Sequence, residues 1–325
     1  MTNATNQARG FTLVEILLSL AIGAILLTAL ADVVAQSLHA GDRIQRQQQL
    51  ASEARFALRR MVNAVGVTPR LLLPSPDLPG TGWSEHIREQ TIPPSAPESG
   101  SVWASAVLAV TLSHSVDLDG NGIPDADNDG DGRIDEDLPD DIHLDYASGI
   151  KGIDDDGDGY VDEAHSHNDD EFEALNNEDW VNGQDDDADG SIDEDPSSDM
   201  NADGCPGICG VDDDGDGSVD EGSDTDDDED GGTQEDWLDP VVFHLVAGEL
   251  VERTPVPWDT TADSVVDGRD YVASTIAENV TRFRVERIPP IDGGPVQIDL
   301  TLVLTDPLTG QTFSLQTRVR VGGAL

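Results

Sequence analysis

A run of apolar residues near the start of the chain, from Phe11 to Leu30, constrains the fold more than any other feature. About 20 apolar residues in a helix span the hydrocarbon core of a bilayer, so we expect a transmembrane helix over residues 11–31. One carboxylate, Glu15, interrupts the run. Because an acid in such a segment costs about 2.5–3.5 kcal/mol at the bilayer centre, Glu15 is expected to have a partner or a function.

The same helix is expected to continue beyond the membrane. After Asp32 the sequence becomes polar, but apolar residues recur at spacings of three and four, which indicates an amphipathic helix. Gly66 and Pro69 are helix-ending signals, so one helix over residues 11–66 is predicted. Its apolar face beyond the bilayer consists of Leu38, Leu50, Ala54, Ala57, Leu58, Met61 and Val65.

Negative charge is concentrated in the middle of the chain. The net charge is −50 over 325 residues, and residues 117–239 contain 48 acids against two bases, Arg133 and Lys151. Such a surface repels nucleic acid and anionic lipid, and no basic stripe argues for phosphate binding. The acidic segment is instead expected to attract cations.

The acidic segment repeats one nine-residue pattern, Asp-x-Asp-x-Asp-Gly-x-(Ile/Val)-Asp, where x is any residue. Four complete copies begin at Asp127, Asp154, Asp185 and Asp212, at separations of 27, 31 and 27 residues, which indicates a repeat array. A fifth, less regular copy begins at Asp117, and weaker traces lie at residues 199–204 and 226–231. The predicted metal ligands are Asp117, Asp119, Asn121, Asp125, Asp127, Asp129, Asp131, Asp135, Asp154, Asp156, Asp158, Asp162, Asp185, Asp187, Asp189, Asp193, Asp212, Asp214, Asp216 and Asp220.

Calcium chemistry explains this spacing. Ca²⁺ takes six to eight oxygen ligands, and loops of the EF-hand type supply them from positions 1, 3, 5, 7 and 9, with glycine at position 6. The complete copies have acids at 1, 3, 5 and 9, and an aliphatic residue at 8 that we expect to pack into a small core. We therefore expect Ca²⁺ as the cofactor, in preference to Mg²⁺, which requires stricter octahedral sites. The alternative is a disordered acidic insert.

Position 12 departs from the EF-hand pattern. A bidentate Glu stands there in EF-hands, whereas this chain has Leu138, His165, Pro196 and Ser223. The missing ligand is expected to come from a neighbouring loop or to be absent.

Two cysteines, Cys205 and Cys209, flank a Pro-Gly turn within the array. In an oxidising compartment such a pair is read as a disulfide. A zinc site would need more soft ligands than two thiols, so a local disulfide is expected.

The segments that flank the array predict a single globular head of class α+β. Apolar runs at 103–113 and 240–246 indicate strands, so the array is expected to be an excursion between strands of one sheet. Runs at 249–254, 279–287, 296–304 and 312–321 predict an antiparallel meander, and Pro-rich residues 74–100 predict an irregular loop. No catalytic constellation emerges, so an enzyme is not expected.

The N-terminal motif, Gly10-Phe11 followed by Glu15, resembles the class III signal of type IV pilins and type II secretion pseudopilins. The resemblance implies cleavage between Gly10 and Phe11 by a prepilin peptidase, N-methylation of Phe11, and pairing of Glu15 with the N-terminal amine of a neighbouring subunit. An ordinary secretory signal, cleaved after small residues such as Ala29 or Ala31, is the alternative.

Two finer resemblances add to this. The stretch 55–61 and the C-terminal strands look like large minor pilins of the PilW type and J-type pseudopilins. The acidic loops resemble those of EF-hands, dockerins and thrombospondin type 3 repeats, and the lack of flanking helices favours the last of these.

Together these features predict a leader at 1–10, a pilin helix at 11–66, a head at 67–116 and 240–325, and a calcium-binding insert at 117–239. The expected function is that of a minor structural subunit of a type IV pilus, in its initiating or tip complex. The expected partners are the peptidase, other pilins and the bacterial inner membrane, with the head in the periplasm and later on the pilus surface. The alternatives are a J-type pseudopilin of type II secretion and a calcium-dependent surface adhesin.

Overall fold

The computed structural model describes residues 13–77, 85–91, 106–155, 157, 159–162, 166–169, 177, 179–181, 196–211, 217–229, 231–290 and 294–323. By internal contacts the chain divides into two units, residues 1–49 and residues 50–325.

In the first unit, the described residues form the N-terminal part of helix α1 (Leu13–Val67). The stretch Leu13–Ala31 is long and apolar enough to cross a membrane, with a mean hydropathy of 2.5, and none of it is buried within the chain. A signal sequence passes the same test of length and composition. The exposed leucine and isoleucine side chains of this stretch leave an apolar surface that only lipid or other protein would cover.

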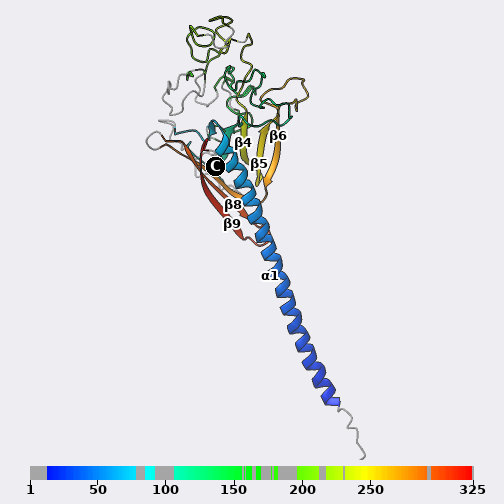
Figure 1. Cartoon of the computed structure of the whole chain (residues 1–325). Helices are drawn as coiled ribbons and strands as arrows, with labels where there is room; N and C mark the ends of the chain where they lie inside the picture. Colours follow the sequence, from blue (N-terminus) through cyan, green and yellow to red (C-terminus); the bar gives the residue numbers. More distant parts are fainter. Residues whose placement is uncertain are drawn as a thin grey trace, which may run out of the picture. The chain divides into compact units, whose positions relative to one another are not determined.

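The second unit contains two antiparallel sheets (Figure 1). One sheet has the strand order β1-β3-β4-β5-β6, formed by Leu71–Leu73, Val107–Thr111, Pro240–Val246, Glu249–Pro255 and Tyr271–Ala277. The other has the order β2-β7-β8-β9, formed by Ile87–Thr91, Val280–Ile288, Gln297–Thr305 and Thr312–Arg320.

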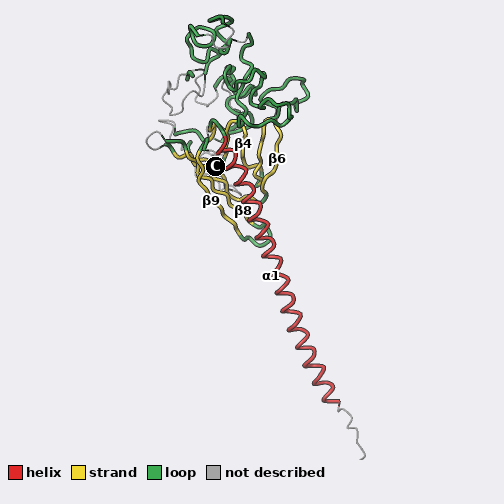
Figure 2. Tube along the Cα trace, viewed as in Figure 1, coloured by secondary structure: helices red, strands yellow, loops and turns green. Residues whose placement is uncertain are grey.

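The core lies where the C-terminal part of α1 meets both sheets (Figure 2). Apolar side chains of the helix at three- and four-residue spacing are buried there, as the amphipathic pattern predicts: Leu50, Ala54, Ala57, Leu58, Met61 and Val65. Strand β8 contributes the alternate residues Ile298, Leu300, Leu302 and Leu304, each fully buried. Buried apolar residues therefore recur with a period of two along β8 and of about 3.6 along α1, and these two faces form opposite sides of one core.

The acidic insert leaves and re-enters the same sheet. Strands β3 and β4 are antiparallel neighbours, with Thr111 opposite Pro240, and the Leu112 N–H donates to the Asp239 carbonyl oxygen at 2.8 Å. The expectation that the array is an excursion between two strands of one sheet is confirmed.

The insert also covers the second face of that sheet. Ile150 and Ile153 pack against Leu73, Val107 and Val242. Every residue of β3 is consequently buried, although an antiparallel sheet of this kind can leave one face in water. A further apolar cluster, formed by Leu138, Ile142, Met200 and Leu238, lies among the loops themselves.

Two expectations about the head were wrong. The C-terminal strands do not form one meander, because β4–β6 belong to one sheet and β7–β9 to the other. The segment 74–100 contains β2, which pairs with β7. Strand β2 is short and mostly polar, so it has no alternating apolar signal. Its Glu89 instead forms ion pairs with Arg282 and Arg284 of β7.

Candidate functional site

The loop that begins at Asp117 shows how the repeated pattern folds. The Gly120 N–H donates to Asp117 Oδ1 at 2.7 Å, and the Gly122 N–H donates to Asp117 Oδ2 at 3.1 Å. The Ile123 N–H donates to Asn121 Oδ1 at 2.6 Å. The side chains at positions 1 and 5 thus fold the backbone around themselves, as Asp and Asn do in turns.

The same contacts recur along the insert. The amide at position 6 donates to the carboxylate at position 1 in the loops that begin at Asp117, Asp141, Asp154 and Asp199, at 2.8–3.1 Å. The amide at position 7 donates to the side chain at position 5 in the loops that begin at Asp117, Asp127, Asp141 and Asp199, at 2.6–3.1 Å. These loops therefore share one conformation.

Backbone angles identify the same conformation independently. Positive φ values recur at position 6, and they also occur at positions 4 and 9 in most of the loops. Glycine adopts such angles without steric cost, which explains its place at position 6 in the pattern. The residues with positive φ at position 6 are Gly122, Gly132, Tyr146, Gly159, Gly204, Gly217 and Gly231.

Sequence reasoning missed one of these loops and reduced two others to traces. The loop that begins at Asp141 has Tyr146 at position 6, with φ of 62°, and Gly149 at position 9. The loops that begin at Asp199 and Asp226 lack the acid at position 9. The acids at positions 1 and 5, Asp141 and Asp145, were the signal that could have revealed the missed loop.

Carboxylates converge in three clusters of the described part of the insert. Oxygen atoms of Asp117, Asp119 and Asp125 lie within 4.8 Å of one another, and so do those of Asp127, Asp129 and Asp131. The third cluster joins Asp129 and Glu136 to Asp228, about a hundred residues later in the sequence. The loop that begins at Asp127 thereby receives a carboxylate from the loop that begins at Asp226.

Burial and crowding disfavour the charged form of Asp125 and Asp127. Burial raises the pKa of Asp125, and the nearby charges of Asp119 and Asp117 raise it further. Burial also raises the pKa of Asp127, with added repulsion from Asp129 and Asp131. Asp125 Oδ1 is buried and has no hydrogen-bond partner among the described residues. A cation placed among these oxygens would offset both effects.

Many predicted ligands lie outside the described residues. They are Asp156, Asp158, Asp185, Asp187, Asp189, Asp193, Asp212, Asp214 and Asp216. The copies that begin at Asp154 and Asp212 retain three described ligands: Asp154 is buried, and Asp162 and Asp220 are exposed. The Asp162 and Asp220 carboxylates accept hydrogen bonds from the Gly152 and Gly210 amides, at 2.7 and 2.6 Å, and thereby close their loops.

The expectation for position 8 holds for one copy and is wrong for two. Ile134 packs against the main core, but the side chains of Val161 and Val219 are 50% and 51% exposed. The aliphatic residue at position 8 is therefore not a general core residue of the array.

The predicted disulfide between Cys205 and Cys209 is present, with a Cα–Cα distance of 5.2 Å. The amides of both cysteines donate to the Asp203 carboxylate at 3.0 Å. The crosslink therefore closes the end of the loop that begins at Asp199.

Comparison with known proteins identifies the N-terminal segment. Residues 5–31 match the family described as the prokaryotic N-terminal methylation motif. The chain carries a type IV pilin-like prepilin signal. No curated protein and no solved structure matches the chain.

The described residues place one part of this motif. Glu15 lies in the first turn of α1, and the Ser19 hydroxyl donates to its carbonyl oxygen at 2.7 Å. The predicted processing residues Gly10 and Phe11 lie outside the described residues. The motif and the apolar helix accord with membrane anchoring of a pilin- or pseudopilin-type protein.

Proposed function

We propose that this chain is a minor structural subunit of a type IV pilus, placed in its initiating or tip complex, with a head stabilised by calcium. The observation that carries the proposal is the methylation motif at residues 5–31, continuous with a helix whose later turns pack on an α+β head. The proposed role is structural and includes no catalytic step.

Processing and assembly follow from the motif. A prepilin peptidase cleaves between Gly10 and Phe11, and the new N-terminal residue is methylated. Glu15 then meets the N-terminal amine of a neighbouring pilin, because a carboxylate in an apolar environment requires an opposite charge. The inner membrane holds the subunit before assembly, with its head in the periplasm.

The size of the head supports a rare position in the filament. Residues 50–325 form the second unit, and the insert adds a broad set of loops at the β3–β4 connection. Heads of this size cannot repeat densely along a fibre. An end position leaves room for them.

Calcium fits the carboxylate clusters. With Ca–O distances of about 2.3–2.6 Å, two ligands of one ion lie at most about 5 Å apart, and the clustered oxygens lie within 4.8 Å. Asp117, Asp119 and Asp125 would hold one ion, and Asp127, Asp129 and Asp131 another. Each ion supplies positive charge to a cluster that contains one buried carboxylate, Asp125 or Asp127, so binding is coupled to folding of the loops.

A cleft between these clusters favours the adhesin as a second candidate. Its volume is about 330 Å³, and its walls include Asp119, Asp129, Trp237 and Pro257. The carboxylates can accept hydrogen bonds from hydroxyl groups, and Trp237 and Pro257 add apolar surface. This combination suits a polyhydroxylated ligand. Binding of the full chain to a glycan array in calcium, and its loss in chelator, would identify an adhesin. A subunit used only for assembly would bind other pilins alone.

The test is isolation of the chain from its native cells. We expect mass spectrometry to find a mature chain that starts at N-methylated Phe11, and immunogold labelling to place it at pilus ends in small numbers. An intact Met1, or cleavage after Ala29 or Ala31, would contradict the pilin signal. Labelling confined to a type II secretion complex would replace the pilus by the pseudopilin alternative.

A further inference from the structure

The β5–β6 connection contains a loop of the same type, although it lies outside the acidic insert. The Ala262 N–H donates to Asp259 Oδ1 at 2.6 Å, and the Ser264 N–H donates to Asp259 Oδ2 at 2.8 Å. The Val265 N–H donates to Asp263 Oδ1 at 3.0 Å. These are the contacts of positions 4, 6 and 7 in the loop that begins at Asp117.

The backbone and the residue types agree with this correspondence. Ala262 and Ser264, at positions 4 and 6, have φ values of 64° and 74°. Asp263 and Asp267 stand at positions 5 and 9, and Val266 stands at position 8. The loop departs from the nine-residue pattern at two positions, with Thr261 in place of Asp at position 3 and Ser264 in place of glycine at position 6, which is why the pattern does not reveal it.

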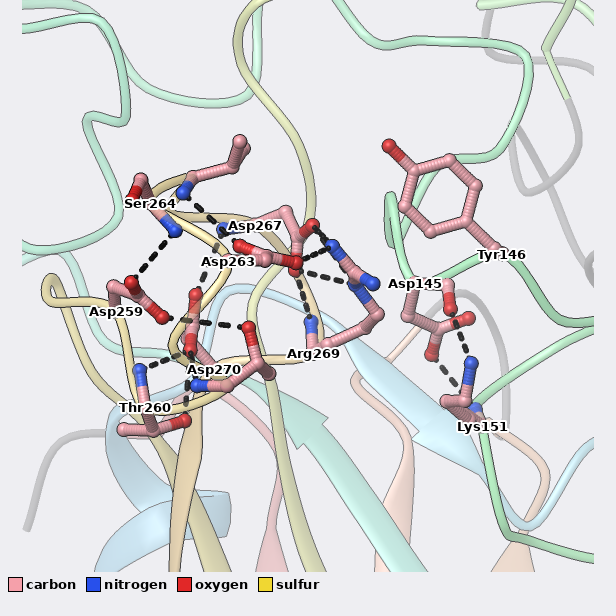
Figure 3. A network of polar contacts seen from close by, with 12 residues as sticks. Asp145, Tyr146, Lys151, Asp259, Thr260, Asp263, Ser264, Asp267, Arg269 and Asp270 are labelled. Carbon is pink, nitrogen blue, oxygen red and sulfur yellow. Dashed lines mark hydrogen bonds and ion pairs between the residues drawn. The ribbon is translucent and has the colours of Figure 1, made fainter.

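A cation is already present among these carboxylates. The Arg269 guanidinium contacts Asp263 Oδ2 through Nη2 at 2.6 Å, and its Nε contacts the two Asp267 oxygens at 3.0 and 2.9 Å (Figure 3). The guanidinium therefore binds the carboxylates at positions 5 and 9. In the insert loops the corresponding carboxylates are predicted metal ligands.

We propose that the loop from Asp259 to Asp267 is a metal-type loop whose cation is the guanidinium group of Arg269. The loop consequently keeps its fold without divalent metal. The hydrogen bonds with the Asp267 carboxylate are the main cause of a raised pKa at Arg269, so the guanidinium group stays charged in the loop.

This loop also supports the insert. Arg269 lies over the ring of Tyr146, 4.9 Å from its centroid, and Tyr146 occupies position 6 of the loop that begins at Asp141 (Figure 3). A Cβ added at Gly268 would overlap the His143 carbonyl oxygen, so the two segments are in close contact. The loop from Asp259 to Asp267, which needs no metal in this proposal, therefore packs against the insert and stabilises it whether or not calcium is bound.

Hydrogen exchange on the full chain in detergent tests the proposal. In chelator, the wild-type amides of Ala262, Ser264 and Val265 should stay protected. In Arg269→Gln they should exchange at least about tenfold faster, because charge-assisted hydrogen bonds are lost. Millimolar calcium should restore their protection by occupying the vacated site. Arg318→Gln is the matched control, since Arg318 forms an equivalent pair with Asp299 on the β8–β9 sheet.

Three results would overturn the proposal: rapid wild-type exchange in chelator, unchanged exchange in Arg269→Gln, or no restoration by calcium. The amides of β8 report whether each variant is folded.

If Arg269→Gln unfolds the head, Asp263→Asn provides the second test. That variant should lose loop protection in chelator, and calcium should fail to restore it because a ligand is gone. Protection of its loop in chelator would also overturn the proposal. The amides of Gly120 and Gly122 report calcium binding by the insert separately.

Discussion

The guanidinium group of Arg88, on strand β2, donates a hydrogen bond to the carbonyl oxygen of Asp154 at 3.2 Å. A second bond goes to the Asp155 carbonyl oxygen. Arg88 is 1% exposed, and a Cβ added at Gly157 would overlap its guanidinium group. The edge strand that sequence reasoning missed therefore holds the loop that begins at Asp154.

The first prediction concerns this contact. Arg88→Met should destabilise the head by about 3–5 kcal/mol, because it leaves the buried Asp155 carboxylate without its nearby positive charge. Exchange of the amides at residues 150–155 should accelerate most. Arg282→Met, which removes a partly exposed pair with Glu89, should cost less than about 1 kcal/mol. Equal effects of the two variants in denaturant titrations would show that Arg88 is not an anchor.

The second prediction concerns the junction of helix and head. Arg60 forms two hydrogen bonds with the buried Glu252 of β5, at 2.9 and 2.6 Å. Arg60→Leu should lower the free energy of unfolding by about 1–3 kcal/mol, because Glu252 would stay buried without its partner. Arg59→Leu changes an exposed neighbour and is expected to have little effect. Thermal unfolding of both variants in detergent measures the difference.

The third prediction concerns pH in the absence of metal. Burial raises the pKa of Asp227 to about 7 and those of Asp135 and Asp145 to about 6. A carboxyl group with a raised pKa in the folded loop stabilises the fold at low pH, and that contribution is lost as the pH rises through about 6–7. In chelator, lowering the pH from about 7.5 to about 4.5 should therefore compact the insert. Small-angle scattering measures this compaction.

Calcium should reverse that dependence, because protons compete with the metal for the same carboxylates. With millimolar calcium the insert should loosen as the pH falls. If the insert expanded on lowering the pH both in calcium and in chelator, the raised pKa values would be contradicted.

The fourth prediction concerns one proposed ion. Asp125→Asn should remove one calcium ion per chain in calorimetric titration, since Asp125 supplies the most buried carboxylate of its cluster. The same variant should stabilise the loop in chelator, because an amide needs no counter-charge. Asp224→Asn changes an exposed acid outside the clusters and should leave the ion count unchanged. An unchanged count for Asp125→Asn would place the metal elsewhere.

The fifth prediction concerns assembly. Glu15→Ala should be processed normally but incorporated poorly into filaments, because the N-terminal amine would lose its carboxylate partner. Ser19→Ala removes only a side-chain bond to the Glu15 carbonyl oxygen and serves as the control. Immunoblots of membrane and sheared-pilus fractions separate the two outcomes. Normal incorporation of Glu15→Ala would remove its proposed role.

Local features could be derived from the sequence alone. The apolar run, the helix that follows it and the regular copies of the acidic loop depend on neighbours within a few residues. A carboxylate at position 1 that binds the amide at position 6 is such a short-range contact, and glycine at position 6 makes it visible. The same reasoning found the disulfide across the Pro-Gly turn and the insertion between β3 and β4.

Only the tertiary structure decided the rest. Strand β2 depends on ion pairs with β7 rather than on an apolar pattern, and the division into two sheets depends on pairings that no short segment specifies. Tyr146 and Ser264 adopt backbone angles that are costly for residues other than glycine, so the surrounding contacts must hold them there. The meeting of Asp129 with Asp228, and of Arg269 with Tyr146, joins residues about a hundred or more positions apart, and only the folded chain brings them together.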